Sequence, residues 1–224
     1  LDYLDVHYYP QAPGVYGNKS DPATRALRIR STRSLWDPSY IDESWIGQAV
    51  DLIPRLKGWI AAGYPGTKLA ITEYNFGGEQ DASGAVALAE ALGAFGRLGV
   101  DLATYWTYPP PDSPAGAAFR LFRDYDGKGA NFGDTSLPVS SGQPAVAAFA
   151  ARHSDGGEID VVLANESQTG TAQVRLEKGG RAAAGTPYCV AAGSSRIVPR
   201  ADVPRGGSVA IGPLGLCLVR LQAA

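Results

Sequence analysis

Three short segments of the chain place a titratable or amide side chain among aromatic rings. They are His7-Tyr8-Tyr9, Glu73-Tyr74-Asn75 and Trp106-Thr107-Tyr108. A carboxylate framed by rings and short of cations suits a carbohydrate site, because rings stack on sugar faces and a carboxylate attacks or stabilises the anomeric carbon. Taken alone, Glu73 fits an ordinary surface ion pair equally well.

Each segment follows a run of residues typical of a β-strand. Residues 68–73 form an apolar, β-favouring run between a Tyr-Pro-Gly turn and a Gly-Gly pair, which predicts a buried parallel strand. Residues 3–9 and 101–108 predict two further strands, each of which stops at proline. Ligands bind at the carboxyl ends of parallel strands, so the three strand ends should meet at one mouth.

Helices are predicted between and after these strands. The first covers about residues 45–62, opens on an acidic cap and is expected to kink at Pro54. The second runs from a cap near residue 81 to Gly99, and the third covers about 115–125. Strand, helix and strand with tight connections form a βαβ unit, which supports the parallel arrangement.

A polar segment over residues 11–41 is predicted to be a long loop. Loops of that length in a compact domain are usually functional. Tyr16, Trp36 and Tyr40 interrupt the polar segment. Their rings either pack the loop onto the fold or form stacking platforms for a planar or sugar ligand.

The sequence changes character at about residue 145. Short alternating runs such as EIDVVLAN, TPYCVAA and GLCLVRLQ follow at close spacing, which predicts an antiparallel β-sandwich. We therefore expect two domains, a parallel α/β part over 1–144 and an accessory all-β sandwich over 145–224. Cys189 and Cys217 lie in two of these runs, and the sequence leaves open whether they form a disulfide or are buried free thiols.

The composition excludes several kinds of partner. The chain has 20 Lys and Arg against 22 Asp and Glu, so neither nucleic acid nor an anionic membrane is expected to bind. His7 and His153 are the only histidines, and no CxxC or HxxxH spacing occurs, so no transition-metal site is expected. The sequence indicates no required cofactor. It leaves open a structural Ca²⁺ site built from oxygen ligands.

Five ordered motifs resemble those of glycoside hydrolase family 44, bacterial endo-acting β-1,4-glucanases that include xyloglucanases. They are LDYLDVHYYPQ, LWDPSYIDESWIG, ITEYNFGG, ATYWTYP and AFRLFRDYDGKGANFGDTS. The resemblance implies a (β/α)₈ TIM barrel followed by the β-sandwich, with barrel strands six to eight in residues 1–144. It also implies a secreted bacterial enzyme that hydrolyses β-glucan polysaccharide with retention of configuration at the anomeric carbon.

The same resemblance implies roles for individual residues. Glu73 matches the nucleophile of the TEYN motif, which would form a covalent glycosyl-enzyme intermediate. His7 and Tyr9 match positions that line the catalytic subsite, and Trp106 matches a sugar platform there. The further substrate-binding candidates are Trp36, Tyr74, Asn75 and Tyr108.

The general acid of the family is a Glu at the end of barrel strand four, which the resemblance puts upstream of Leu1. A retaining pair needs two carboxyl groups about 5 to 5.5 Å apart. Glu43, Glu79 and Glu166 are better explained as a helix-cap charge, a group at a distal subsite and a turn residue. We therefore expect this chain to need the missing N-terminal half of the barrel and to be inactive alone. The alternative is a non-catalytic carbohydrate-binding fragment or a structural remnant.

Overall fold

Three neighbouring parallel strands carry the candidate site residues. In the computed structural model, which describes residues 1–222, they are β1 (Tyr3–Tyr8), β2 (Lys68–Tyr74) and β3 (Leu102–Tyr105). Their order is β1-β2-β3, with Tyr8 beside Tyr74 and Tyr74 beside Tyr105. The predicted strands and their shared direction are confirmed, although β3 ends at Tyr105 and Trp106 follows it.

Two helices lie where the sequence predicts them. Helix α3 spans Ala82–Leu98, begins with the Asp81 carboxylate accepting from an amide of its first turn and ends at Gly99, whose φ is 67°. Helix α4 spans Pro114–Arg123 and is capped by Ser113. Within residues 1–222, no helix combines the length and the apolar character that crossing a bilayer requires.

The segment predicted as a long loop contains a helix, so that prediction was wrong. Helix α1 spans Pro22–Ser31 and continues into the 3₁₀ helix η1 (Thr32–Leu35). Its inward face includes Arg28 as well as Ile29. Helix prediction relies on apolar residues at helical spacing, and an arginine on the buried face does not count as apolar. The sequence of α1 therefore showed no amphipathic helical pattern.

The predicted helix over 45–62 begins later than expected. Helix α2 spans Leu52–Gly63, and Trp45, at the predicted start, is 82% exposed. Pro54 therefore lies in the first turn, where its missing N–H removes no helical hydrogen bond and requires no kink.

The runs after residue 145 form antiparallel strands, as predicted. The larger sheet has the order β11-β10-β13-β6-β5-β4, a smaller sheet pairs β12 with β7, and β8 and β9 form a hairpin. The bounds are β4 (Thr135–Leu137), β5 (Val146–Arg152), β6 (Ile159–Asn165), β7 (Ala172–Arg175), β8 (Glu177–Lys178), β9 (Arg181–Ala182), β10 (Gly185–Val190), β11 (Val198–Pro199), β12 (Ser208–Ile211) and β13 (Leu216–Leu221). Because β4 belongs to the larger sheet, that sheet includes residues before 145, and the division at 144/145 stays a prediction.

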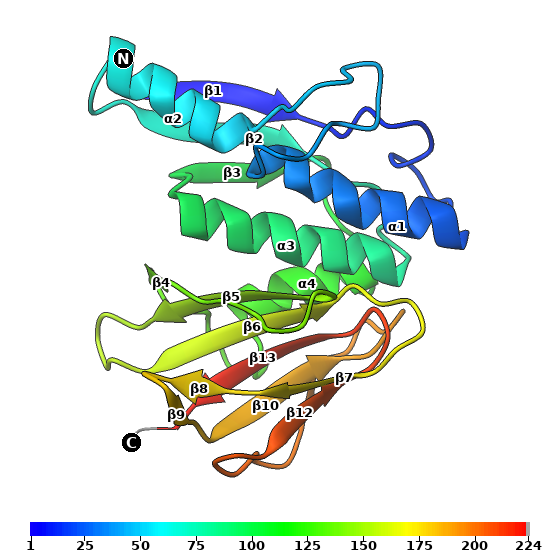
Figure 1. Ribbon diagram of the computed structural model, residues 1–224, viewed down its shortest axis with the longest axis vertical. Helices are drawn as coiled ribbons and strands as arrows, with labels where there is room; N and C mark the ends of the chain where they lie inside the picture. Colours follow the sequence, from blue (N-terminus) through cyan, green and yellow to red (C-terminus); the bar gives the residue numbers. More distant parts are fainter. Residues whose placement is uncertain (223–224) are drawn as a thin grey trace.

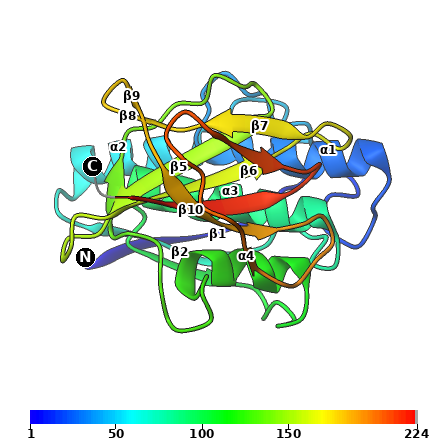
Figure 2. The same ribbon diagram turned by 90° about the horizontal axis from the view of Figure 1, so that it is seen from below.

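The six-stranded sheet is buried on both faces. In β13, Cys217 and Val219 belong to the core shared with β7 and β12, whereas Leu216 and Leu218 belong to the core shared with the helices. Figure 1 shows the resulting layers: the parallel sheet, then α3 and α4, then the six-stranded sheet, then β7 and β12. The view from below places the antiparallel strands across α3 and α4 (Figure 2).

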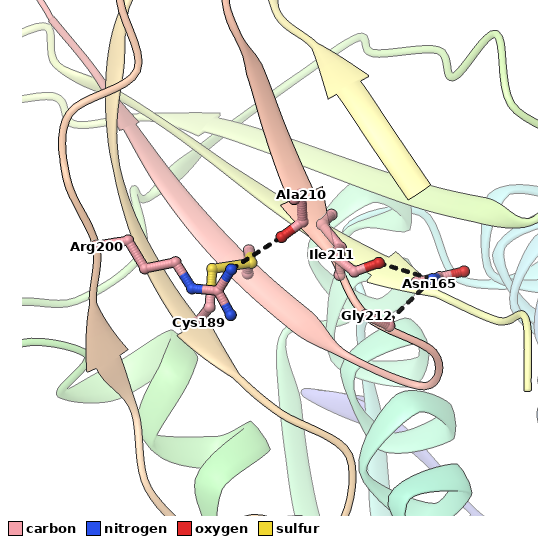
Figure 3. Close-up of a disulfide and its surroundings, with 7 residues drawn as sticks. Asn165, Cys189, Arg200, Ala210, Ile211 and Gly212 are labelled. Carbon is pink, nitrogen blue, oxygen red and sulfur yellow. Dashed lines mark hydrogen bonds between the residues drawn. A yellow bond between two sulfur atoms is a disulfide. The ribbon is translucent and has the colours of Figure 1, made fainter. Parts of the chain in front are cut away.

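A disulfide joins Cys189 and Cys217, which decides the alternative that the sequence left open. The two residues lie opposite each other on β10 and β13, with their Cα atoms 4.1 Å apart. Beside it, Arg200 reaches across to the smaller sheet and donates from Nη1 to the carbonyl of Ala210 at 3.0 Å (Figure 3). The disulfide fixes the register of two central strands, and the arginine links the two sheets.

Candidate active site

Glu73, at the carboxyl end of β2, is held by two residues from the end of β1. The Tyr9 hydroxyl donates to Oε2 at 2.8 Å, and Nδ1 of His7 lies 3.3 Å from the same oxygen. Within residues 1–222, Oε1 accepts no hydrogen bond, and the side chain is 27% exposed. One carboxylate oxygen is therefore fixed by the protein while the other is available to a ligand.

The environment of Tyr9 keeps its hydroxyl a donor. Desolvation, followed by the hydrogen bond to Glu73 and the charge of that carboxylate, raises the pKa of Tyr9 to about 12. Loss of the phenol proton would place two anions in contact, which is why the hydrogen bond to Glu73 and the charge of Glu73 both raise the pKa of Tyr9. The phenol thus stays protonated at neutral pH and orients the carboxylate.

An open cavity of about 520 Å³ lies beside this pair. Tyr9, Tyr16 and Trp106 line it together with residues 10–14. The rings of Tyr9 and Tyr16 meet edge to face with their centroids 5.8 Å apart, and Trp106 is 48% exposed. Aromatic walls next to an oriented carboxylate are what a sugar-binding cleft requires. Tyr108 is 75% exposed and is absent from this lining, so its predicted role stays a prediction.

Tyr74 and Asn75 are buried, which contradicts their prediction as substrate-binding residues. Tyr74 is 1% exposed and packs edge to face against Tyr105. Asn75 is 4% exposed, donates from Nδ2 to the carbonyl of Trp106 at 2.5 Å and accepts at Oδ1 from the Gly77 amide at 2.7 Å. These two residues hold the strand ends in place, because their polar and apolar surfaces are already used by the protein.

Trp36 is also not part of this site, which corrects a further prediction. Its ring lines a separate cavity of about 490 Å³ against the six-stranded sheet, together with Phe149. The guanidinium of Arg97 covers the ring at 4.9 Å from its centroid. Trp36 therefore belongs to the contact between the helices and the antiparallel sheet.

Known proteins resemble most of this chain in sequence, and solved structures match it along its whole length. Endoglucanase A of Paenibacillus lautus is 39% identical over 178 residues, which are 75% of this chain and 25% of that protein. The solved structure of CelM2, a bifunctional glucanase-xylanase from a metagenome library, is 40% identical with a TM-score of 0.93, over 100% of this chain and 44% of its own. A Paenibacillus polymyxa xyloglucanase from glycoside hydrolase family 44 is 32% identical with a TM-score of 0.88, over 100% of this chain and 47% of its own.

The chain belongs to glycoside hydrolase family 44. It spans less than half the length of the family 44 structures that it matches. For the endoglucanase Cel44A of Clostridium thermocellum, the matched share is 47% of that protein's chain. No protein-family model matches the sequence.

Two other glutamates of this family 44 chain have partners of their own. Glu43 forms an ion pair with Arg30 of α1 at 2.9 Å, and this partner holds the pKa of its carboxyl below the usual range. Glu79 accepts from the Tyr105 hydroxyl at 2.9 Å and from Asn75 at 3.2 Å. Both carboxylates are therefore engaged in binding other parts of the protein.

Asn165 ends β6 and Glu166 follows it, in the antiparallel part of the chain. The Asn165 amide is buried and donates to the carbonyls of Ile211 and Gly212 at 3.0 and 2.9 Å (Figure 3). Glu166 lines the cavity that contains Trp36. The pair anchors a turn, as predicted from the sequence. No group of three or more His, Cys, Asp or Glu side chains within residues 1–222 could hold a metal ion.

Tyr16 was named from the sequence only as a ring within the polar segment, and Arg28 was not predicted to have any role. Both belong to the segment that was assigned to a loop. A usable signal was present, because Asp21 followed by proline is a strong start for a helix and places Arg28 within it. The burial of Arg28 carries no local signal of this kind.

Proposed function

We propose that this chain supplies the nucleophile half of a retaining, endo-acting β-1,4-glucan hydrolase, with Glu73 as the nucleophile. The observation that carries the proposal is the hydrogen bond from Tyr9 to Oε2 of Glu73 at the edge of an aromatic-walled cavity. The oriented carboxylate attacks the anomeric carbon with its free oxygen while the glycosidic C–O bond breaks and the general acid protonates the leaving oxygen, which gives a glycosyl-enzyme intermediate. Water then hydrolyses this intermediate and frees the carboxylate. Trp106 supports the sugar ring during the attack.

We assign β1, β2 and β3 to strands six, seven and eight of a (β/α)₈ barrel. Three adjacent parallel strands with a helix between β2 and β3 support this assignment, as does membership of family 44. Within residues 1–222, the outer edges of β1 and β3 pair with no further strand. The remaining barrel strands would cover those edges and would bring the general acid to Glu73.

The proposed substrate is a β-1,4-glucan such as a soluble cellulose derivative or xyloglucan. Matched proteins include endoglucanases, and one matched structure is a Paenibacillus polymyxa xyloglucanase with xyloglucan. We further propose a secreted enzyme that needs no cofactor, since a carboxylate pair and a water molecule complete the reaction.

A trapping experiment tests the assignment of the nucleophile. The enzyme with its complete barrel is incubated with an activated 2-fluoro-cellobioside, digested and mapped by mass spectrometry. We expect the added mass on the peptide that contains Glu73, and no added mass in the Glu73→Gln variant. A label on any other carboxylate would overturn the assignment.

A non-catalytic glycan-binding role is the second candidate. It is favoured by one observation, because the lining of the described cavity contains no acidic side chain that could act as the general acid. An affinity gel with xyloglucan, run beside a reducing-sugar assay, separates the two roles. Retardation without release of reducing ends by the complete protein would favour the binding role.

A further inference from the structure

Arg28 is a fully buried cation whose hydrogen-bond partners, within the described residues, include no carboxylate. Its side chain is 0% exposed, on the inward face of α1. The guanidinium donates to the backbone carbonyl of Val15 at 3.2 Å, of Gly17 at 3.2 Å and of Lys19 at 2.9 Å. A buried charge is retained only where its donors are satisfied, so these three carbonyls are bound strongly.

The segment held by Arg28 forms one wall of the candidate site. Residues 10–14 and Tyr16 line the cavity beside Glu73, and Val15 is fully buried between them. The Tyr16 ring is 55% exposed and rests on the ring of Tyr9. The position of Tyr16 is therefore set by the carbonyls on either side of it, which Arg28 binds.

Arg28 also contacts the segment that follows Glu73. Its Nη1 donates to the Ser83 hydroxyl at 2.6 Å, at the start of α3. A Cβ at Gly78 would lie 2.7 Å from the guanidinium carbon, and the Gly78 amide donates to the carbonyl of Gly17 at 2.7 Å. The guanidinium thus lies between the β2–α3 connection and the loop that carries Tyr16.

We propose that Tyr16 is a sugar-stacking residue of this cavity and that Arg28 is the positioning residue that holds it there. Substrate stacks on Tyr16 and Trp106, which line one cavity, while Arg28 acts only through the backbone of residues 15–19. The planar guanidinium of Arg28, with its five N–H donors, is needed to hold this segment. A lysine ammonium cannot reach three carbonyls and a hydroxyl in the same geometry. The chemical class of the ligand, a β-glucan chain, rests on the proposed function.

Steady-state kinetics on a soluble β-glucan with the complete enzyme test the proposal. We expect Tyr16→Ala to raise KM by about tenfold with a nearly unchanged kcat, because it removes one stacking face used in ground state and transition state alike. Tyr16→Phe should keep the KM of the wild type. We expect Arg28→Lys to raise KM by a similar factor.

The double variant is the decisive measurement. If Arg28 acts through Tyr16, Arg28→Lys combined with Tyr16→Ala is no worse than Tyr16→Ala alone. The proposal would be overturned if the KM increase of the double variant equalled the product of the two single increases, or if either single variant had an unchanged KM. Arg30→Lys is the matched control, since Arg30 lies on the same helix and pairs with Glu43 at the surface; its KM should stay within about twofold of the wild type.

A second variant covers the case in which Arg28→Lys does not fold. Ser83→Ala removes the acceptor of Nη1, together with the hydrogen bond that the Ser83 hydroxyl donates to Asp81 at 2.7 Å, and should raise KM by a smaller factor with an unchanged kcat; an unchanged KM would count against the proposal. Failure of the proposed function has a different signature, because the wild-type enzyme itself would then release no reducing ends from the glucan.

Discussion

Tyr9 and Glu73 lie 64 positions apart in the sequence and share a 2.8 Å hydrogen bond where β1 and β2 end. The bond uses one oxygen of the carboxylate and leaves the other without a hydrogen-bond partner among residues 1–222. It therefore aligns the proposed nucleophile without occupying the atom that would attack. The consequences of this alignment can be measured.

Replacing Tyr9 with phenylalanine should lower kcat/KM of the complete enzyme by about tenfold or more. The change removes a hydrogen bond to a charged group, which contributes about 1.5 to 3 kcal/mol, while the ring remains to support Tyr16. Tyr64→Phe is the control, because Tyr64 is 66% exposed between α2 and β2. Equal kinetics for Tyr9→Phe and the wild type would show that the hydrogen bond does not serve catalysis.

The stability of the folded protein should fall as the pH rises above the ordinary carboxyl range, because of Glu90. This side chain of α3 is 6% exposed, and its Oε1 has no hydrogen-bond partner. Burial, followed by the charge of Glu166, raises the pKa of Glu90 well above its ordinary value of 4.5. The folded state thus binds a proton that the unfolded state releases, and the stability it contributes below pH 4.5 is lost as the pH passes the folded-state pKa.

The hydrogen bonds of Thr32 agree with a protonated Glu90. Its single hydroxyl hydrogen has two neighbours at 2.7 Å, the carbonyl of Ile29 and Oε2 of Glu90. A protonated Glu90 donates to Thr32 while Thr32 donates to Ile29, so both contacts are satisfied.

Urea midpoints between pH 4.5 and 8 test this assignment of Glu90. Glu90→Gln should flatten the decline, whereas Glu177→Gln, at an exposed position of β8, should leave it unchanged. Arg33 and Arg97 share the cavity with Glu90 and Glu166 and are retained in both variants. Parallel declines for the wild type and Glu90→Gln would contradict the assignment.

Gly93 and Gly96 of α3 should respond in opposite ways to alanine. A Cβ at Gly93 would lie 2.2 Å from the ring of Phe149 in β5, whereas a Cβ at Gly96 would meet nothing within 4 Å. Gly93→Ala should therefore destabilise the protein by about 1 to 3 kcal/mol through overpacking, despite its better helix propensity. Gly96→Ala should stabilise it by about 0.5 to 1 kcal/mol. Chemical denaturation of both variants measures the contrast, and stabilisation in both would refute the close packing.

Breaking the disulfide should lower the free energy of unfolding by about 3 to 4 kcal/mol, from the chain entropy of its loop. Cys189 and Cys217 are 28 positions apart, and both are buried. The double Cys→Ala variant should unfold at a lower urea concentration than the oxidised wild type. Dithiothreitol should lower the midpoint of the wild type alone; a shift of equal size in the variant would show that another process is responsible.

The local patterns of the sequence were sufficient for most of the elements that build the site. The apolar run before Glu73, the prolines that end the other two strands and the caps of α3 act within a few residues, so they can be recognised without tertiary information. The same patterns placed the aromatic groups and the carboxylate at one edge of the parallel sheet. Membership of the family also followed from motifs in the printed sequence.

Only the tertiary structure decided which side chains at that edge face a ligand. Tyr9 and Tyr74 are both tyrosines next to a strand end, yet the first contacts Glu73 at the cavity and the second is 1% exposed in the core. Arg28 lies in the segment that was predicted to be a polar loop, yet it is fully buried and donates to three carbonyls. Burial depends on contacts between residues far apart in the chain. The spacing of apolar residues reflects only the local sequence and therefore cannot predict those contacts.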